Sequence, residues 1–206
     1  MDDAMTPLEA LRLAMKGAEI DAYFIPHGDA FSGEEVQAAD ERLAWISGFT
    51  GSAGIAIVTM DAAILFSDGR YTLQMKTQTN SHWQCMVMPR NKPSDWIKSH
   101  LGGKTLGFDP MLMTMSEHSQ LICALSDKDI DVKPVADNLI DQIWKDRPAP
   151  KISIPWDVDP LHHGLDRADK INAAVADMKD AGADILMICD PTELAWLLNI
   201  RAADLS

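Results

Sequence analysis

The stretches that decide the fold are MKGAEIDAYFI at residues 15–25 and RLAWISGF at residues 42–49, because both recur later in the chain. MKDAGADILMI stands at residues 178–188 and ELAWLLNI at residues 193–200, which gives offsets of 163 (178 − 15) and 151 (193 − 42) positions. The difference between the two offsets, 12 positions, indicates an insertion in the first copy, around residues 27–39. Each copy has the pattern of a helix, a strand and a short helix, so one supersecondary unit occurs twice.

The residues between the two copies show strand and helix patterns in alternation. This alternation, with one hairpin, is typical of an α/β domain with a mixed sheet. We therefore predict an α/β fold, a mixed β-sheet flanked by helices, followed by the start of a second, related α/β domain. Thr6 and Glu9 form a predicted capping box at the first helix. The predicted strands cover residues 22–25, 55–60, 63–66, 83–88, 104–108 and 130–135, and the predicted helices begin near residues 7 and 71 and cover residues 93–101, 115–125 and 138–144.

The domain organisation follows from the repeat and from a proline-rich stretch that begins with RPAP at residues 147–150. We predict a first domain at residues 1–147, a linker at residues 148–164, and the truncated beginning of a duplicate domain at residues 165–206. Helix and strand patterns resume between residues 165 and 189. Only six residues follow the second copy. We therefore expect this chain to be the N-terminal part of a longer protein.

Composition restricts the partners and the compartment. The net charge of −13 argues against nucleic acid or an anionic membrane as a partner, since both require basic patches. The acidic start MDDAMTP lacks the apolar region of a signal peptide, and no apolar run approaches the roughly 20 residues that span a bilayer. Three scattered cysteines in apolar surroundings indicate reduced core thiols of a cytoplasmic protein: Cys85, Cys123 and Cys189.

Two motifs that could carry chemistry do not match their templates. The turn Gly51-Ser52-Ala53-Gly54 is preceded by Thr50, where a nucleophile elbow requires glycine, so we expect it to serve close packing. The six histidines lack the spacing of metal ligands, and the adjacent pair His162-His163 stands in the predicted linker. We therefore assign no catalytic residue and no metal ligand to this chain.

Asp68-Gly69-Arg70-Tyr71 stands where a strand runs into a helix, which is the kind of sheet edge that often holds a binding site. Arg70 could bind a carboxylate there through its planar fork of donors. Alternatively, Asp68 caps the helix and Arg70 forms a structural ion pair.

Two tryptophans, Trp45 and Trp196, occupy equivalent positions in the two copies. We expect both to be core residues, because large aromatics repeated in this way are most simply explained by packing. If the second copy is cut short, however, Trp196, Leu197 and Ile200 should be partly exposed.

Several motifs in the same order resemble the N-terminal domain of the Xaa-Pro aminopeptidases (aminopeptidase P) of the creatinase/prolidase group. The likeness covers nearly the whole chain. It rests on ERLAWISGFTGSAG at residues 41–54, FSDGRY at 66–71, GFDP at 107–110, NLIDQIWKDRP at 138–148 and ELAWLLNIR at 193–201.

The resemblance implies a protein with two related α/β domains before a catalytic domain that this chain lacks. That later domain holds two divalent metals, usually manganese, and hydrolyses the Xaa-Pro bond at peptide N-termini in the cytoplasm. The present chain is then a non-catalytic region that takes part in homodimer formation and in access of proline-containing peptides. The resemblance also implies that Arg70 faces the active-site entrance and binds substrate.

Two alternatives remain open from the sequence. The chain could be a stand-alone interaction or dimerisation module, or a fragment of a related prolidase- or creatinase-type hydrolase. The half-finished repeat argues against the first, because residues 166–206 would lack sheet partners. The duplicated unit argues against the second, because those relatives typically have a single N-terminal domain.

Overall fold

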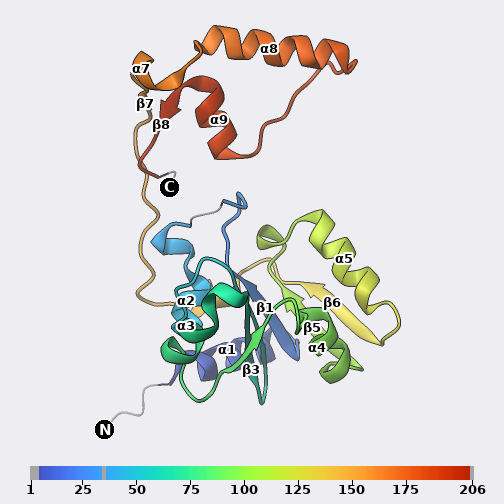
Figure 1. Cartoon of the computed structure of the whole chain (residues 1–206). Coiled ribbons are helices and arrows are strands. Elements are labelled where there is room, and N and C mark those ends of the chain that lie inside the picture. The colour runs from blue at the N-terminus through green and yellow to red at the C-terminus, as the bar shows by residue number, and fades with distance from the viewer. Residues whose placement is uncertain (1–4, 34–35, 205–206) are drawn as a thin grey trace.

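A computed structural model describes residues 5–33 and 36–204 of the chain. Within these residues, six strands form one sheet in the order β4-β3-β2-β1-β5-β6 (Figure 1). The strands are β1 (Ala22–Pro26), β2 (Ile55–Thr59), β3 (Ala63–Ser67), β4 (Gln84–Val87), β5 (Lys104–Phe108) and β6 (Ile130–Pro134).

The sheet is mixed, as predicted. Strand β2 runs antiparallel to both of its neighbours, β1 and β3, with Ala22 opposite Thr59 at one end of the β1–β2 ladder. The pairs β1–β5, β3–β4 and β5–β6 are parallel. All strands except β2 therefore end at the same edge of the sheet, which we call the carboxyl edge.

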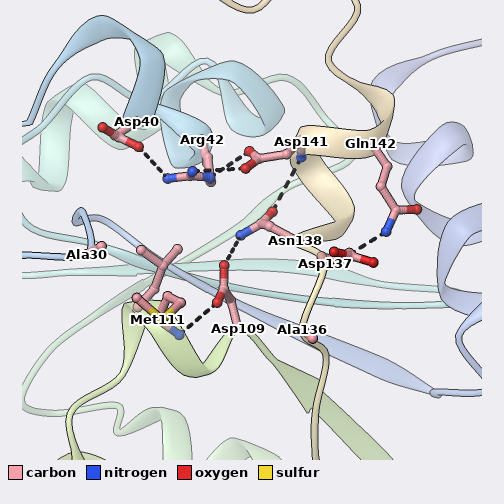
Figure 2. A pocket seen from close by; sticks show the side chains of 11 residues that line it. Ala30, Asp40, Arg42, Asp109, Met111, Ala136, Asp137, Asn138, Asp141 and Gln142 are labelled. Carbon is pink, nitrogen blue, oxygen red and sulfur yellow. Dashed lines mark hydrogen bonds and ion pairs between the residues drawn. The ribbon is translucent and has the colours of Figure 1, made fainter. Parts of the chain in front are cut away.

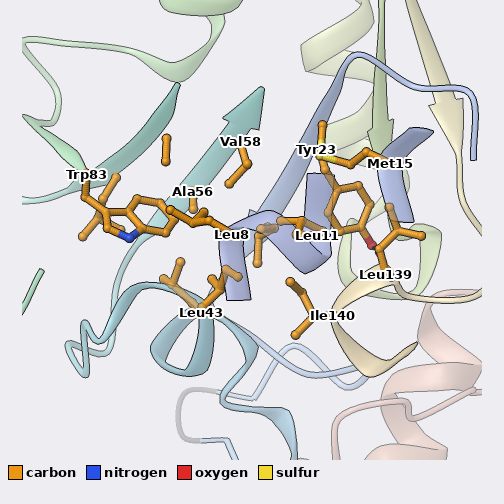
Figure 3. Close-up of a cluster of buried hydrophobic side chains, with 14 of the residues drawn as sticks. Leu8, Leu11, Met15, Tyr23, Leu43, Ala56, Val58, Trp83, Leu139 and Ile140 are labelled. Atoms are coloured by element: carbon orange, nitrogen blue, oxygen red, sulfur yellow. Dashed lines mark hydrogen bonds between the residues drawn. The ribbon is translucent and has the colours of Figure 1, made fainter. Parts of the chain in front are cut away.

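Helices cover both faces of the sheet, and the apolar side chains between the layers form two cores. The first core lies under α1 (Pro7–Gly17), α2 (Arg42–Ser47), α3 (Thr72–Gln78) and α6 (Leu139–Ile143). Figure 3 shows part of it, where Leu11 and Tyr23 are fully buried and the Tyr23 hydroxyl accepts a hydrogen bond from the Leu139 amide. The second core lies under α4 (Pro93–His100) and α5 (Met115–Leu125). We call residues 5–33 and 36–144 the sheet unit.

The first helix begins as its sequence predicts. The Thr6 side chain accepts a hydrogen bond from the Glu9 amide, and the Glu9 carboxylate accepts one from the Thr6 amide at 2.8 Å. The capping box is therefore confirmed. Since these local bonds satisfy amides that have no partner inside the helix, they define where α1 starts.

Beyond α6 the chain leaves the sheet unit as an extended segment and forms a smaller C-terminal unit, residues 156–204 (Figure 1). It contains β7 (Trp156–Asp157), α7 (Pro160–His163), α8 (Arg167–Asp180), α9 (Pro191–Leu198) and β8 (Ile200–Arg201). Strands β7 and β8 pair antiparallel. In the described chain, no helix is long and apolar enough to cross a membrane.

The repeat is visible in the hydrogen bonds that end the first helix of each copy. The Ile20 amide donates to the Met15 carbonyl at 3.1 Å, and the Ala183 amide donates to the Met178 carbonyl at 2.8 Å. Both bonds span the same number of residues and lie 163 positions apart. The helix ends of the two copies therefore have the same local structure.

Left-handed backbone conformations recur at equivalent positions too. The residues are Glu19 (φ 56°) and Gly182 (φ 66°) after the first helix of each copy, and Gly48 (φ 81°) and Asn199 (φ 52°) after the second. Glycine and asparagine are the residues that adopt this conformation most easily at a helix end. The second helices α2 and α9 thus end in the same way, although one uses glycine and the other asparagine.

One predicted strand is absent from the C-terminal unit. Residues 183–189 have no regular structure, and Ile185 and Met187 are 85% and 81% exposed. The prediction of a strand between residues 165 and 189 is therefore wrong for this structure. No described strand lies beside this segment, and a strand requires hydrogen bonds to a neighbour.

Two other sequence predictions are confirmed only in part. Trp45 is half-buried and stacks on Trp144 with ring centroids 5.4 Å apart, as expected of a core residue. Its counterpart Trp196 is 56% exposed, so the prediction of a core residue is wrong there, whereas the prediction of partial exposure in a shortened copy is confirmed. The three cysteines are free thiols, but Cys123 and Cys189 are exposed and only Cys85 is half-buried, so the prediction of core thiols is wrong for two of them. Leu197 and Ile200 are half-buried, as expected for a unit without a sheet.

Candidate functional site

The carboxyl edge of the sheet collects most of the motifs that the sequence singles out. Residues 52–54 precede β2 at this edge, and residues 68–71 follow β3. Asp109 follows β5 at the same edge. Because parallel strands bring their C-terminal ends together, residues far apart in the sequence meet here.

Arg70 lies on the short turn that follows β3. The Asp68 carboxylate caps the 3-10 turn Gly69–Tyr71 by accepting a hydrogen bond from the Arg70 amide at 2.9 Å. The Arg70 guanidinium also donates to that carboxylate, from Nε at 3.1 Å to each oxygen and from Nη2 at 2.8 Å. These bonds from Arg70 hold the pKa of Asp68 below its usual value. The turn therefore presents an oriented guanidinium whose side chain is 67% exposed.

Tyr71 connects this turn to the glycine-rich turn before β2. Its hydroxyl and the Ser52 hydroxyl are 2.8 Å apart, and its ring packs edge-on against Phe49 with centroids 5.6 Å apart. A Cβ atom on Gly51 would lie 2.2 Å from the Phe49 ring, so this close approach requires glycine. The expectation that the glycine-rich turn serves packing is therefore confirmed. The Arg70 guanidinium lies 5.1 Å from the centre of the Tyr71 ring.

The structure shows the cap and the ion pair that were one of the two interpretations of Arg70. It also shows why a ligand could still reach this side chain, since the pair with Asp68 leaves two thirds of it exposed. A role of Arg70 in binding substrate stays a prediction.

A second cluster lies on the same edge, around the buried guanidinium of Arg42 (Figure 2). Its Nε and Nη2 atoms donate to the two carboxylate oxygens of Asp141 at 2.7 and 3.0 Å, and Nη1 donates to Asp40 at 2.9 Å. Arg147 reaches Asp141 from the other side at 2.7 Å. Burial lowers the pKa of Arg42, but the bonds and charges of Asp141 and Asp40 more than offset this and raise it above the usual value.

Asp109 and Asn138 extend this cluster toward β5. The Asn138 side-chain amide donates to Asp109 at 2.7 Å (Figure 2). Its oxygen accepts from the Ile140 amide at 2.9 Å. The other oxygen of Asp109 accepts from the Met111 amide at 2.8 Å. Together with Arg42 and Asp141, these residues line an open pocket of about 640 Å³. Since each of these carboxylates is engaged by hydrogen bonds within the cluster, the arrangement is that of a structural network.

The sequence analysis did not identify this network, although Arg42, Asp109, Asn138, Asp141 and Arg147 lie in motifs that carried the family resemblance. Arg42 and Asp141 are separated by 99 positions, and Asp109 and Asn138 by 29. One feature of the sequence could have indicated the pair of Arg42 and Asp141: a basic and an acidic residue stand in separate motifs that both carry the family resemblance. The network joins α2, the end of β5 and α6.

The described residues do not fit a metal centre. Within residues 5–33 and 36–204, no group of three or more His, Cys, Asp or Glu side chains could hold a metal ion. The His163 ring has Asp166 at 4.0 Å, and the His27 ring has Glu41 at 3.8 Å, which are pairs rather than ligand sets.

Comparison with known proteins separates the chain into two matched parts. Residues 7–141 match the model of the creatinase/prolidase N-terminal domain, and residues 146–206 match a second model with the same description. Aminopeptidase P2 of Arabidopsis thaliana is 37% identical over 99% of this chain and 29% of its own length. Xaa-Pro aminopeptidase 1 of Dictyostelium discoideum is 34% identical over 97% of this chain and 34% of its own length.

Solved structures give the same result. The X-prolyl aminopeptidase of Caenorhabditis elegans, described as a cytosolic enzyme with a di-nuclear active site, superimposes with a TM-score of 0.89 at 29% identity, over 98% of this chain and 35% of that one. The N-terminal domain of a metallopeptidase from Corynebacterium diphtheriae shares the fold, with a TM-score of 0.52 at 24% identity over 64% of this chain and 94% of that one. The chain spans about a third of the length of the curated relatives that it matches. It belongs to the creatinase/prolidase N-terminal domain family.

Proposed function

We propose that this chain is the non-catalytic N-terminal region of a cytoplasmic aminopeptidase that hydrolyses the Xaa-Pro bond at peptide N-termini. The observation that carries this proposal is the match to X-prolyl aminopeptidases along almost the whole chain, with a TM-score of 0.89 for the C. elegans enzyme. That match includes both copies of the repeat. A dipeptidase from Bacillus anthracis shares only the fold, with a TM-score of 0.51 at 18% identity.

The proposed organisation has a first domain at residues 1–147, a linker at 148–164 and the start of a second domain from residue 165. The identical hydrogen bonds and left-handed residues at the helix ends of the two copies support it. The exposure of Ile185 and Met187 supports it too, because their counterparts Ala22 and Phe24 lie in β1, within the sheet. The remaining strands of the second domain would come from chain outside residues 1–206.

Catalysis is assigned to that further part of the protein. We propose that this part holds two divalent metal ions and that these are manganese. The described residues of the present chain contain no group of side chains that could hold a metal ion. The relative described as having a di-nuclear active site is about three times as long as the region that it shares with this chain. We therefore assign no reaction step to any residue of this chain.

Arg70 is the residue that we propose to contact substrate in the complete enzyme. Its guanidinium is oriented by Asp68 and Tyr71 at the carboxyl edge and remains 67% exposed. A guanidinium held in this way suits the carbonyl oxygens or the terminal carboxylate of a proline-containing peptide. The partners that we propose are such peptides and a second copy of the complete protein. The net charge of −13 disfavours nucleic acid and anionic membranes.

A chimera tests the proposed function. Residues 1–206 would replace the matching region of Arabidopsis aminopeptidase P2, and release of the first residue from an Xaa-Pro-Pro peptide would be measured with manganese and with chelator. We expect chelator-sensitive turnover by the chimera and none by residues 1–206 alone. A folded, metal-loaded chimera without turnover would contradict the proposal. Chelator-sensitive turnover by the purified chain alone would do so as well.

A further inference from the structure

The insertion that distinguishes the first copy of the repeat ends in a segment with an unusual set of neighbours. This segment is Gln37 followed by the 3-10 turn Ala38–Asp40. It contacts Arg147 just before the linker, Lys151 in the linker, and the last described residues of the C-terminal unit. The second copy has no counterpart of this segment, because its strand-like stretch leads into α9 almost directly.

Gln37 makes the most specific of these contacts. Its side-chain oxygen accepts a hydrogen bond from the Lys151 amide at 2.7 Å. Its side-chain nitrogen donates to the Asp204 carbonyl at 2.9 Å and lies 3.5 Å from the Lys151 carbonyl. One side chain thus joins the sheet unit to the backbone of the linker and to the backbone of the segment after β8.

The neighbouring residues hold the same three segments together. Arg147, the last residue before the linker, donates from Nε to the Ala39 carbonyl at 2.7 Å. Farther along the linker, the Ser153 hydroxyl donates to the Asp204 carboxylate at 2.7 Å and accepts from the Ala203 amide at 2.7 Å. Hydrogen bonds from Ser153 hold the pKa of Asp204 below its usual value. Hydrogen bonds therefore hold the linker at Lys151 and Ser153, and the chain just before it at Arg147.

We propose that Gln37 is the clasp that fixes the orientation of the C-terminal unit on the sheet unit. The linker between them contains several prolines and has no regular structure from residue 148 to residue 155, so no helix or strand sets its path there. The Gln37 side chain fixes the path of the linker through its hydrogen bonds to the backbone of Lys151 and Asp204. The insertion of the first copy thus serves to dock one repeat on the other.

The chemistry of the contact requires a side-chain amide. A primary amide carries an acceptor and donors on neighbouring atoms, so it can serve an N–H group and carbonyl groups at once. A glutamate at position 37 would keep the acceptor for the Lys151 amide but could not donate to the Asp204 carbonyl. It would also add a negative charge beside Asp40 and Asp204. Gln37→Glu should therefore break the contact with the Asp204 backbone, although the two side chains have nearly the same size.

The test uses the complete 206-residue chain and two of its own cysteines. Cys123 on α5 and Cys189 in the C-terminal unit are both exposed, so spin labels on them report the distance between the two units once Cys85 is replaced by serine. This background would carry Gln37→Ala, Gln37→Glu or the control Gln142→Ala. Gln142 is an exposed glutamine of α6 whose side-chain nitrogen donates to the nearby Asp137 carbonyl at 3.0 Å.

We expect a narrow distance distribution in the parent and in Gln142→Ala, and a broad one in both Gln37 variants. Hydrogen exchange of the Lys151 amide should rise about tenfold in Gln37→Ala. The loss of one hydrogen bond shifts the equilibrium between the bonded and the open amide by about a factor of ten. Unchanged thermal unfolding of the sheet unit would show that the variants are folded. A broad distribution in the parent would overturn the proposal, as would Gln37 variants that match Gln142→Ala in both distance distribution and Lys151 exchange.

Discussion

The two copies of the repeated unit have the same helix ends but opposite surroundings. In the first copy Ala22 and Tyr23 are fully buried in the sheet, whereas their counterparts Ile185 and Leu186 are 85% and 52% exposed. The helix ends that flank these positions carry the same hydrogen bonds and the same left-handed residues. Local sequence therefore suffices for the helices and their ends, while a strand and a core require neighbours that lie far away in the chain.

Two basic side chains of α8 join this helix to α9 in the C-terminal unit. The buried ammonium group of Lys170 donates to the Trp196 carbonyl at 2.8 Å and to the Asn199 side chain at 2.6 Å, and lies 4.3 Å from the centre of the Trp196 ring. Arg167 donates to the Leu198 carbonyl at 2.6 Å. Both cations lie at the C-terminal end of α9, where unpaired carbonyls and the helix dipole favour positive charge.

The largest expected difference between the copies comes from a leucine that both contain. Leu43 of α2 is 1% exposed and Leu194, its counterpart in α9, is 41% exposed. Leu43→Ala should lower the free energy of unfolding of the sheet unit by ~3 kcal/mol, because it leaves a cavity in the core. Leu194→Ala should cost less than ~1 kcal/mol. Urea unfolding followed by circular dichroism measures both, and equal costs would contradict the comparison.

The buried ion network should give the next largest effect. Asp141→Asn keeps the size of the side chain but removes the charge that faces Arg42, whose side chain is only 8% exposed. We expect the free energy of unfolding to fall by ~2 kcal/mol, since a buried guanidinium loses its main partner. Asp68→Asn is the matched control, because its partner Arg70 is 67% exposed. If the free energy of unfolding fell by similar amounts in Asp141→Asn and Asp68→Asn, the burial of Arg42 would not be the reason that its ion pair stabilises the fold.

A smaller effect is expected from the cation that holds the C-terminal unit. Lys170→Met keeps most of the apolar stem but leaves the Asn199 oxygen and the Trp196 carbonyl without this donor. We expect a loss of ~1 kcal/mol, confined to α8 and α9. Hydrogen exchange should therefore rise in residues 191–199 and stay unchanged in β1. Exchange that rises equally in both units would mean that the two are one cooperative unit.

The smallest effect concerns the turn that carries Arg70. The bonds from Arg70 lower the pKa of Asp68, so the contribution of this pair is present above the ordinary carboxyl pKa and is lost as the pH falls through the lowered value. Arg70→Ala should move the pKa of Asp68 back up toward its usual value. Carbon NMR of the Asp68 carboxyl group measures this shift. An unchanged pKa in Arg70→Ala would show that the guanidinium does not hold the carboxylate in solution.

The elements of the sheet unit could be predicted from sequence because their signals are local. Residues 104–108 and 115–125 form the expected strand and helix at the expected bounds, since turn residues and a capping box delimit them. The strand expected before Cys189 failed because its apolar pattern is satisfied only beside other strands. The pair of Arg42 and Asp141 was missed because no local pattern shows which charges meet across 99 positions. The position of Arg70 on a capped turn was predicted, whereas its link through Tyr71 to Ser52 was not.

Hydrogen exchange of equivalent amides in the two copies tests the central comparison most directly. The strand residues 22–25 and their counterparts 185–188 would be compared in one experiment on the 206-residue chain. We predict that residues 22–25 exchange only with unfolding of the sheet unit and that residues 185–188 exchange close to the rate of an unprotected peptide. Equal protection of the two segments would contradict the account, because the second copy would then have found strand partners within this chain.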